Sequence, residues 1–404
     1  MTSVVPRSSV PQVASEQGET PSVPPRRMQL PGIDLIRAIA VLTVIYSHIS
    51  YYLIDDLHTG WWLIDWVYAV FVNAIGLNQH LSFLGVAFFM VVTGFLLTGS
   101  ATRQKPMQFM VNRIARLVPS LWLTLVVAIV LVRLGINSLF SGQPTITNGQ
   151  ALLSFVFGGF FLDHQAVVLG VTWTLLVQIF FYVYCISARR VLQTKPILVP
   201  LAGGLFSGAV LIAYHFLVHN PAEVPILFKV AGTLPAIFVG QIIYLAWTGI
   251  ADWRWVVAAT LVQVEVVRLA SGWDAYGAGV EHYLWTMAVV SAVVLLLATH
   301  GGPLAQARVV KWLATRSYAI YLVHTLVLYR AYDMTVGFFG KTGAIVVFLV
   351  IAGLCSEALY RWVEVPCAKW ITGRYRARTE RIAARSIEPC LGTTNSSEKL
   401  AQSR

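Results

Sequence analysis

The chain has few charged residues and lacks the cysteine patterns of metal sites and disulfide frameworks. Only 12% of its 404 residues are Asp, Glu, Lys or Arg, whereas 57% are hydrophobic, a composition outside the soluble globular range. Cys185, Cys355, Cys367 and Cys390 form no CxxC pair. Neither structural disulfides nor a metal site is therefore expected. The composition indicates a polytopic membrane protein.

The sequence also lacks a visible repeat, which disfavours a solenoid or an obvious inverted-repeat transporter. Residues 1–29 are polar and rich in Pro and Ser, and residues 371–404 are basic and then rich in polar residues. Neither end has enough apolar residues to pack, so we expect a disordered N-terminal tail and a largely disordered C-terminal tail. We expect no cleaved signal peptide, because no small-residue cleavage site follows the long first apolar run. The chemistry is then confined to the membrane domain, 30–370.

Ten apolar runs of about 17 to 25 residues are long enough to cross a bilayer as helices. They lie at approximately 31–53, 80–99, 115–136, 170–188, 197–217, 226–247, 255–270, 283–299, 317–335 and 342–364. This pattern predicts an all-α polytopic membrane protein of about ten transmembrane helices.

The net charge of +11 is explained by the orientation of the protein in a membrane rather than by nucleic-acid binding. Lys and Arg gather in alternate loops and in the C-terminal segment, whereas the loops at 54–79 and 137–169 contain neither. By the positive-inside rule, those two loops face outward and both termini are cytoplasmic. An odd number of spans would place the basic C-terminal segment outside. We expect a lipid bilayer as partner and no nucleic acid.

The first predicted span carries three ionisable residues, Asp34, Arg37 and His48. Such a group in the hydrocarbon region costs roughly 2.5 to 3.5 kcal/mol on insertion scales. Arg37 and His48 are eleven residues apart, close to three helical turns, so they project from one face about 16 Å apart. Asp34 can pair with Arg37, or both can extend to the headgroups. His48 lies deeper and is expected to face a cavity or a partner.

Arg113 and Arg116 lie three residues apart at the predicted inner end of the third span. The positive-inside rule alone explains them more readily. The alternative is a site for the phosphate groups of a cytosolic ligand, because arginines on one helical face bind phosphate well.

Several other polar residues lie within or beside apolar runs. Thr93 and Gln178 are of the kind that packs or hydrogen-bonds between membrane helices. Tyr321 and His324 share a helical face in the ninth span, where a second intramembrane histidine again requires a cavity. Glu364 lies at the end of the last span, where a helix terminus alone explains it.

Six short motifs occur along the chain in the order known from one protein family. They are Arg37-x10-His48, Phe88-Phe89-x3-Thr93-Gly94-Phe95, Arg113-x2-Arg116-x2-Pro119, Trp173-Thr174-Leu175-x6-Tyr182, Ser317-Tyr318-x2-Tyr321-Leu322-x-His324 and Glu364-x-Pro366. With these motifs the chain resembles the acyltransferase family 3 membrane O-acyltransferases over about residues 30 to 370. Each motif is weak alone, and the specificity comes from their order over ten predicted spans.

The resemblance implies transfer of an acetyl or similar short acyl group to a hydroxyl of a polysaccharide, glycolipid or macrolide sugar. It implies cytosolic acetyl-CoA, or another short acyl-CoA, as co-substrate, no tightly bound cofactor, and a multi-pass protein of the bacterial plasma membrane. The sequence departs from the family at two positions. Gln178 stands where many members have Glu, and Thr93 where Ser is common. Position 178 therefore offers no carboxylate, whereas position 93 keeps its hydroxyl.

Thioester acyl transfer needs a base for the alcohol proton, a stabiliser for the oxyanion and an anchor for the anionic donor. We hypothesise that His48 is the base and that Arg113 and Arg116 anchor the donor. Arg37 either completes the anchor or orients the thioester carbonyl, and a covalent acyl-enzyme stays open. The further pocket candidates, which include possible positioning groups for His48, are Asp34, Thr93, Gln178, Tyr182, Ser317, Tyr321, His324 and Glu364.

A different class of function, a transporter or flippase of a glycolipid or acyl intermediate, also uses buried ionisable groups, which then line a substrate or proton path. It predicts movement of a substrate without covalent change. The acceptor and the oligomeric state are not predicted by the sequence.

Overall fold

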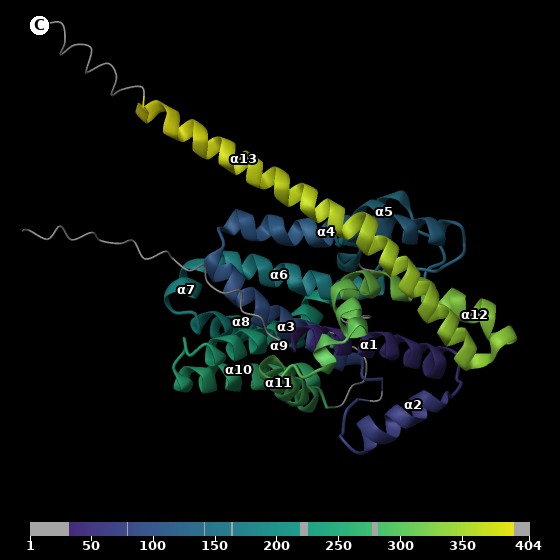
Figure 1. The fold of residues 1–404 in the computed structure, drawn as a ribbon. Helices are drawn as coiled ribbons and strands as arrows, with labels where there is room; N and C mark the ends of the chain where they lie inside the picture. Colours follow the sequence, from purple (N-terminus) through teal and green to yellow (C-terminus); the bar gives the residue numbers. More distant parts are fainter. Residues whose placement is uncertain are drawn as a thin grey trace, which may run out of the picture.

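All regular elements in the described part of the chain are helices (Figure 1), as predicted. The computed structural model describes residues 32–391 except 79, 141, 163–164, 219–224 and 277–281. The predicted N-terminal tail at 1–29 lies outside the described residues, as do residues 392–404 of the predicted C-terminal tail.

The α-helices and the short π-helical or 3-10 turns, labelled η, follow one another along the chain. They are α1 (Ile33–Tyr51), η1 (Tyr52–Asp56), α2 (Trp62–Val67), η2 (Tyr68–Asn73), α3 (Ser82–Arg103), α4 (Pro106–Arg133), α5 (Asn148–Ser154), η3 (Gly158–Phe161), η4 (Gly170–Thr172), α6 (Trp173–Ser187), α7 (Arg189–Thr194), α8 (Leu198–Leu217), α9 (Ile226–Trp247), α10 (Trp253–Gly272), α11 (Tyr283–Thr299), η5 (Leu304–Gln306), α12 (Arg308–Leu359), η6 (Tyr360–Glu364) and α13 (Val365–Leu391).

Eight of the described helical segments are long and apolar enough to span a membrane, which confirms the all-α polytopic class. Seven of these segments match seven predicted spans one to one, and the eighth, Arg308–Ile382, contains the last two predicted spans, at 317–335 in α12 and at 342–364 in α12 and η6. The remaining predicted span, 283–299, is α11, a shorter apolar helix. Gly340, with φ +65°, interrupts α12, a conformation open to glycine because it has no Cβ. The number of crossings and the side of each terminus stay predictions.

Helix α3 packs closely against α1 and α9. Glycines permit its approach to α9: a Cβ at Gly94 would overlap the Ile237 carbonyl oxygen, and one at Gly240 would overlap that of Val91. Small residues where membrane helices meet let the backbones come close. Gly94 is thus a packing residue, and its neighbour Thr93 faces a cavity.

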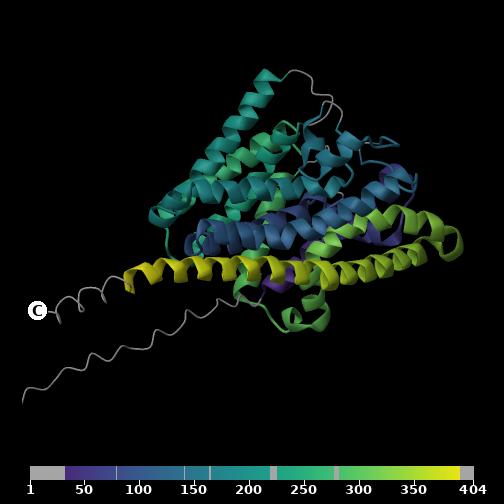
Figure 2. The ribbon, with the colours of Figure 1, turned by 90° about the horizontal axis from the view of Figure 1, so that it is seen from above.

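The last described part of the chain, up to Leu391, forms a long helix that leaves the bundle. After Gly340, α12 continues through η6 into α13, which packs on α4 and extends beyond the other helices (Figures 1 and 2). Residues 371–391 are helical, in contrast to the largely disordered tail that their polar composition predicted. Where α13 contacts α4, tertiary packing favours the helix in a way that composition does not reveal.

Candidate functional site

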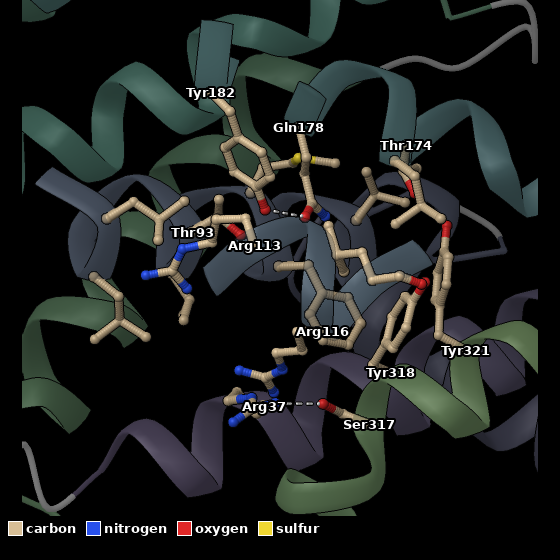
Figure 3. Close-up of a pocket in the computed structure, with 18 of the residues that line it drawn as sticks. Arg37, Thr93, Arg113, Arg116, Thr174, Gln178, Tyr182, Ser317, Tyr318 and Tyr321 are labelled. Atoms are coloured by element: carbon tan, nitrogen blue, oxygen red, sulfur yellow. Dashed lines mark hydrogen bonds between the residues drawn. The ribbon is translucent and has the colours of Figure 1, made fainter. Parts of the chain in front are cut away.

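Three arginines from two helices line one cavity of about 330 Å³. Arg37 comes from α1, and Arg113 and Arg116 come from α4. The close-up shows all three beside this space, which we call the arginine cavity (Figure 3). The remaining predicted pocket residues that line it are Thr93, Gln178, Tyr182, Ser317 and Tyr321.

Neutral side chains, rather than carboxylates, hold two of these arginines. Arg37 Nη2 donates a 2.9 Å hydrogen bond to Ser317 Oγ, and Arg113 Nη2 donates a 3.2 Å bond to Ser100 Oγ. Nε of Arg113 is buried without a hydrogen-bond partner among the described residues. Both guanidinium groups therefore keep positive charge and free donors for a ligand.

Arg116 has the only ion pair among the three in the described part of the chain. Its Nε lies 3.6 Å from Oε1 of Glu364, a residue only 4% exposed. The other carboxylate oxygen of Glu364, Oε2, is buried with no hydrogen bond within the described ranges. Three guanidinium groups against one carboxylate leave an excess of positive charge, which suits a phosphate-bearing ligand.

Gln178 and Tyr182 lie across the cavity from Arg37 and Arg116, on the same side as Arg113 (Figure 3). The Tyr182 hydroxyl donates a 3.0 Å hydrogen bond to Gln178 Oε1. The residues lie four apart on α6, so one helical face presents both. The amide thus positions the tyrosine without adding a negative charge that would compete with an anionic ligand.

Tyr321 closes the end of the arginine cavity. Its hydroxyl forms a 2.6 Å hydrogen bond with Thr174 Oγ1 and donates a 2.9 Å bond to the Val171 carbonyl oxygen. Val171 lines a second cavity, of about 560 Å³, which shares no lining residue with the first. The contact between Tyr321, Thr174 and Val171 is therefore a wall between two cavities.

His48 lies on the far side of this wall and lines the second cavity, which we call the histidine cavity. Its ring meets that of the fully buried His324, with 3.3 Å between His324 Nε2 and His48 Nδ1. Each Nδ1 also bonds the carbonyl oxygen four residues earlier, Val44 at 2.9 Å and Ile320 at 3.1 Å. A carbonyl oxygen only accepts, so in the neutral rings both Nδ1 atoms carry hydrogen and His48 Nε2 keeps a lone pair.

The structure separates two residues that the sequence placed on one helical face. Arg37 and His48, on one helix, line different cavities. Asp34 lines neither cavity, and its carboxylate forms no hydrogen bond or ion pair with the described residues, whereas Arg37 bonds Ser317. His324 lines neither cavity and contacts the His48 ring through its Nε2 atom.

Sequence reasoning missed most of the histidine cavity. Tyr52, Asp56, Tyr329 and Asp333 all line it, but no motif marks them. The only feature of the sequence that connects them is a spacing of four residues on each helix, which places Tyr52 and Asp56 on the same face as His48. Tyrosines and aspartates near a membrane surface are ordinary in a sequence, so this spacing could not be recognised before the fold was known.

Comparison with known proteins agrees with the motifs. A family model described as an acyltransferase domain matches residues 30–361, more than half of the chain. No curated protein and no solved structure matches. The extent of the family match shows that this chain belongs to acyltransferase family 3.

Proposed function

We propose that this membrane acyltransferase is an O-acetyltransferase of the bacterial plasma membrane. It takes a short acyl group from cytosolic acyl-CoA and transfers it to a hydroxyl of an envelope polysaccharide, a glycolipid or a macrolide sugar. The observation that carries the proposal is the pairing of an arginine-lined cavity with a second cavity where His48 Nε2 has a free lone pair.

The arginine cavity suits the donor. In the predicted orientation, Arg37, Arg113 and Arg116 lie in the inner half of the molecule, where acyl-CoA arrives. Their guanidinium groups bind the anionic end of the donor, and its acyl-bearing arm points toward Tyr321. The limited cavity volume of about 330 Å³ favours a short acyl chain.

The histidine cavity suits the acceptor. An acceptor hydroxyl gives its proton to His48 Nε2, and its oxygen forms a bond with the thioester carbonyl carbon. The carbon–sulfur bond breaks, and the CoA thiolate takes up the proton that His48 accepted. His324 keeps the His48 ring in the reactive orientation through the contact between His324 Nε2 and His48 Nδ1. The acyl group has to pass the wall at Tyr321 to meet the hydroxyl.

The test is transfer of labelled acetyl from acetyl-CoA to envelope glycans and glycolipids, in membranes that contain wild-type protein or His48→Ala. Loss of a general base lowers the rate by about 10²–10⁴-fold, and we expect a loss in this range. The control is His215→Ala, since His215 stacks on Trp273 with 4.2 Å between ring centroids and lines neither cavity.

Two results contradict the proposal. A His48→Ala protein that is inserted normally and transfers acetyl at the wild-type rate rules out His48 as the base. A wild-type protein that moves an unaltered glycolipid between leaflets and transfers no acetyl is a transporter instead.

A further inference from the structure

The outer part of the histidine cavity has a regular wall on α1 and η1. His48, Tyr52 and Asp56 follow one another at four-residue intervals and all line the cavity. Because side chains four apart share a helical face, they form one row from the imidazole to the mouth. A carboxylate thus stands at the entrance to the base.

A second row on α12 faces the same space. Thr325, Tyr329 and Asp333 repeat the four-residue spacing, starting directly after His324. The two rows touch, because the Tyr52 hydroxyl donates a short hydrogen bond to Asp333 Oδ1 and the Tyr52 and Tyr329 rings lie 4.9 Å apart. Thr325 Oγ1 is buried without a hydrogen-bond partner among the described residues. The cavity is therefore a polar, aromatic space built by both helices.

The charges in this cavity are opposite to those of the arginine cavity. Asp56 and Asp333 contribute two carboxylates, and Arg330 is the one guanidinium among the lining residues of the described chain. Arg330 Nε donates to the Ile136 carbonyl oxygen, which holds it at the loop. Neither aspartate forms an ion pair within the described residues. The space in front of His48 therefore carries an excess of negative charge.

Carboxylates accept hydrogen bonds and repel anions. Hydroxyl and ammonium groups donate hydrogen bonds to carboxylates, whereas a phosphate or a uronate carboxylate is repelled by their negative charge. Like-charge juxtaposition is a common way to reject a wrong ligand. Tyr52 and Tyr329 add aromatic surface suited to a sugar ring or an ammonium group.

We propose that Asp56 and Asp333 are specificity-determining residues, so that the histidine cavity admits uncharged or amine-bearing hydroxyl compounds and excludes anionic ones. That these compounds are acyl acceptors rests on the proposed function. The charge selection itself does not depend on it.

Charge selection is measured without knowledge of the acceptor, by the reactivity of a cysteine placed in the cavity. Ser138 lines the histidine cavity and is exposed. Ser138→Cys is made in a background with Cys355, Cys367 and Cys390 replaced by Ser, and the buried Cys185 retained. The purified protein reacts with a trimethylammonium-ethyl or a sulfonato-ethyl methanethiosulfonate. The cysteine thiolate forms a mixed disulfide with the reagent and methanesulfinate leaves.

The matched control is Gly149→Cys, an exposed position in the same predicted outer loop with open space around an added Cβ. We expect the ratio of cationic to anionic labelling rates to be roughly tenfold higher at Ser138→Cys than at the control, from the field of the carboxylates. High salt should reduce the difference. Asp56→Asn with Asp333→Asn should bring the ratio to the control value or below it, because the Arg330 guanidinium remains in the cavity.

Asn at position 333 keeps an acceptor for the Tyr52 hydroxyl, and Asp65→Asn tests an exposed carboxylate on α2 that lines neither cavity. Equal ratios at the two cysteines overturn the proposal, as does a ratio that survives the double Asn variant. A charge preference in a protein that transfers no acetyl upholds the selection and refutes the proposed function. Acetyl transfer that depends on His48, together with equal labelling ratios at the two cysteines, upholds the proposed function and refutes the charge selection.

Discussion

The arginine cavity and the histidine cavity differ in charge and in how readily the sequence reveals them. The first holds three guanidinium groups and lies beside one buried carboxylate, Glu364. The second holds more carboxylates than guanidinium groups. The wall at Tyr321 lies between them. Under the proposed function, a donor with phosphates is matched to the first cavity and an acceptor with hydroxyls to the second, and this difference in charge keeps the two substrates from exchanging sites.

We expect the largest effect from removing the positive charge of the arginine cavity. Arg113→Ala with Arg116→Ala should weaken acetyl-CoA binding about 100-fold or more, since a hydrogen bond to a charged group contributes roughly 1.5–3 kcal/mol. Because Arg116→Ala leaves the buried Glu364 carboxylate without its partner, the variant also carries Glu364→Gln. Donor affinity is measured by calorimetry on the purified protein.

Arg133→Ala is the control for this variant, because Arg133 lies at the other end of α4 and bonds Asn148. It should leave donor affinity unchanged. The arginine variant should also leave the labelling ratio at Ser138→Cys unchanged, because that position belongs to the other cavity. Unaltered acetyl-CoA affinity after removal of both arginines would exclude them as the donor anchor.

Sequence reasoning described the arginine cavity better than the histidine cavity for a physical reason. Arg37 is costly within an apolar run and therefore stands out, and Arg113 and Arg116 belong to one of the six family motifs. Asp56 and Asp333 lie at helix ends near the predicted surface, where charge is expected. The wall was not predictable at all, because it depends on contacts between Tyr321 and residues about 150 positions away.

The dependence of the wall on tertiary contacts also explains why the prediction for the first helix was only partly informative. The spacing of Arg37 and His48 placed them on one helical face, but the contact of Tyr321 with Thr174 and Val171 separates the two cavities that they line. Gln178, the least typical position for the family, lines the arginine cavity as an amide that accepts from Tyr182. The fold class followed from hydropathy alone, because only helices satisfy every backbone polar group within a single apolar span.

A medium effect is expected from loosening the wall. Tyr321→Phe removes the hydroxyl that bonds Thr174 and Val171 and keeps the ring. Losing these two buried hydrogen bonds, of about 1 kcal/mol each, makes an open wall roughly thirtyfold more populated. Water then reaches the thioester, so CoA release in the absence of acceptor should rise by a similar factor.

Tyr318→Phe is the matched control, because Tyr318 lines the same cavity but donates its 2.7 Å hydrogen bond to the Leu117 carbonyl oxygen, away from the wall. Thiol release is followed with a chromogenic disulfide. An equal rise in both variants, or none in Tyr321→Phe, would show that this contact does not separate the cavities.

The smallest effect concerns the end of α1 beyond His48. His80 receives or donates a 2.9 Å hydrogen bond with Ser50 Oγ, and its Nε2 lies 3.4 Å from Asp55 Oδ2. The imidazole also stacks on Tyr51, with 4.0 Å between ring centroids. One nearly buried side chain therefore fixes three residues of the helix end that carries the histidine cavity.

Burial lowers the pKa of His80, and the Asp55 carboxylate offsets this only in part. The folded protein then binds fewer protons than the unfolded chain between the lowered pKa and about pH 6.5, the ordinary value for histidine. In that window stability decreases as the pH falls, and above it this contribution is constant.

His80→Gln should remove this pH dependence of stability. The change in melting temperature with pH, measured in detergent, should therefore differ between wild type and variant by about 2 °C. His58→Gln, at an exposed histidine in the loop after η1, should behave like wild type. A wild-type response retained in His80→Gln would mean that acid changes the stability of the protein through groups other than His80.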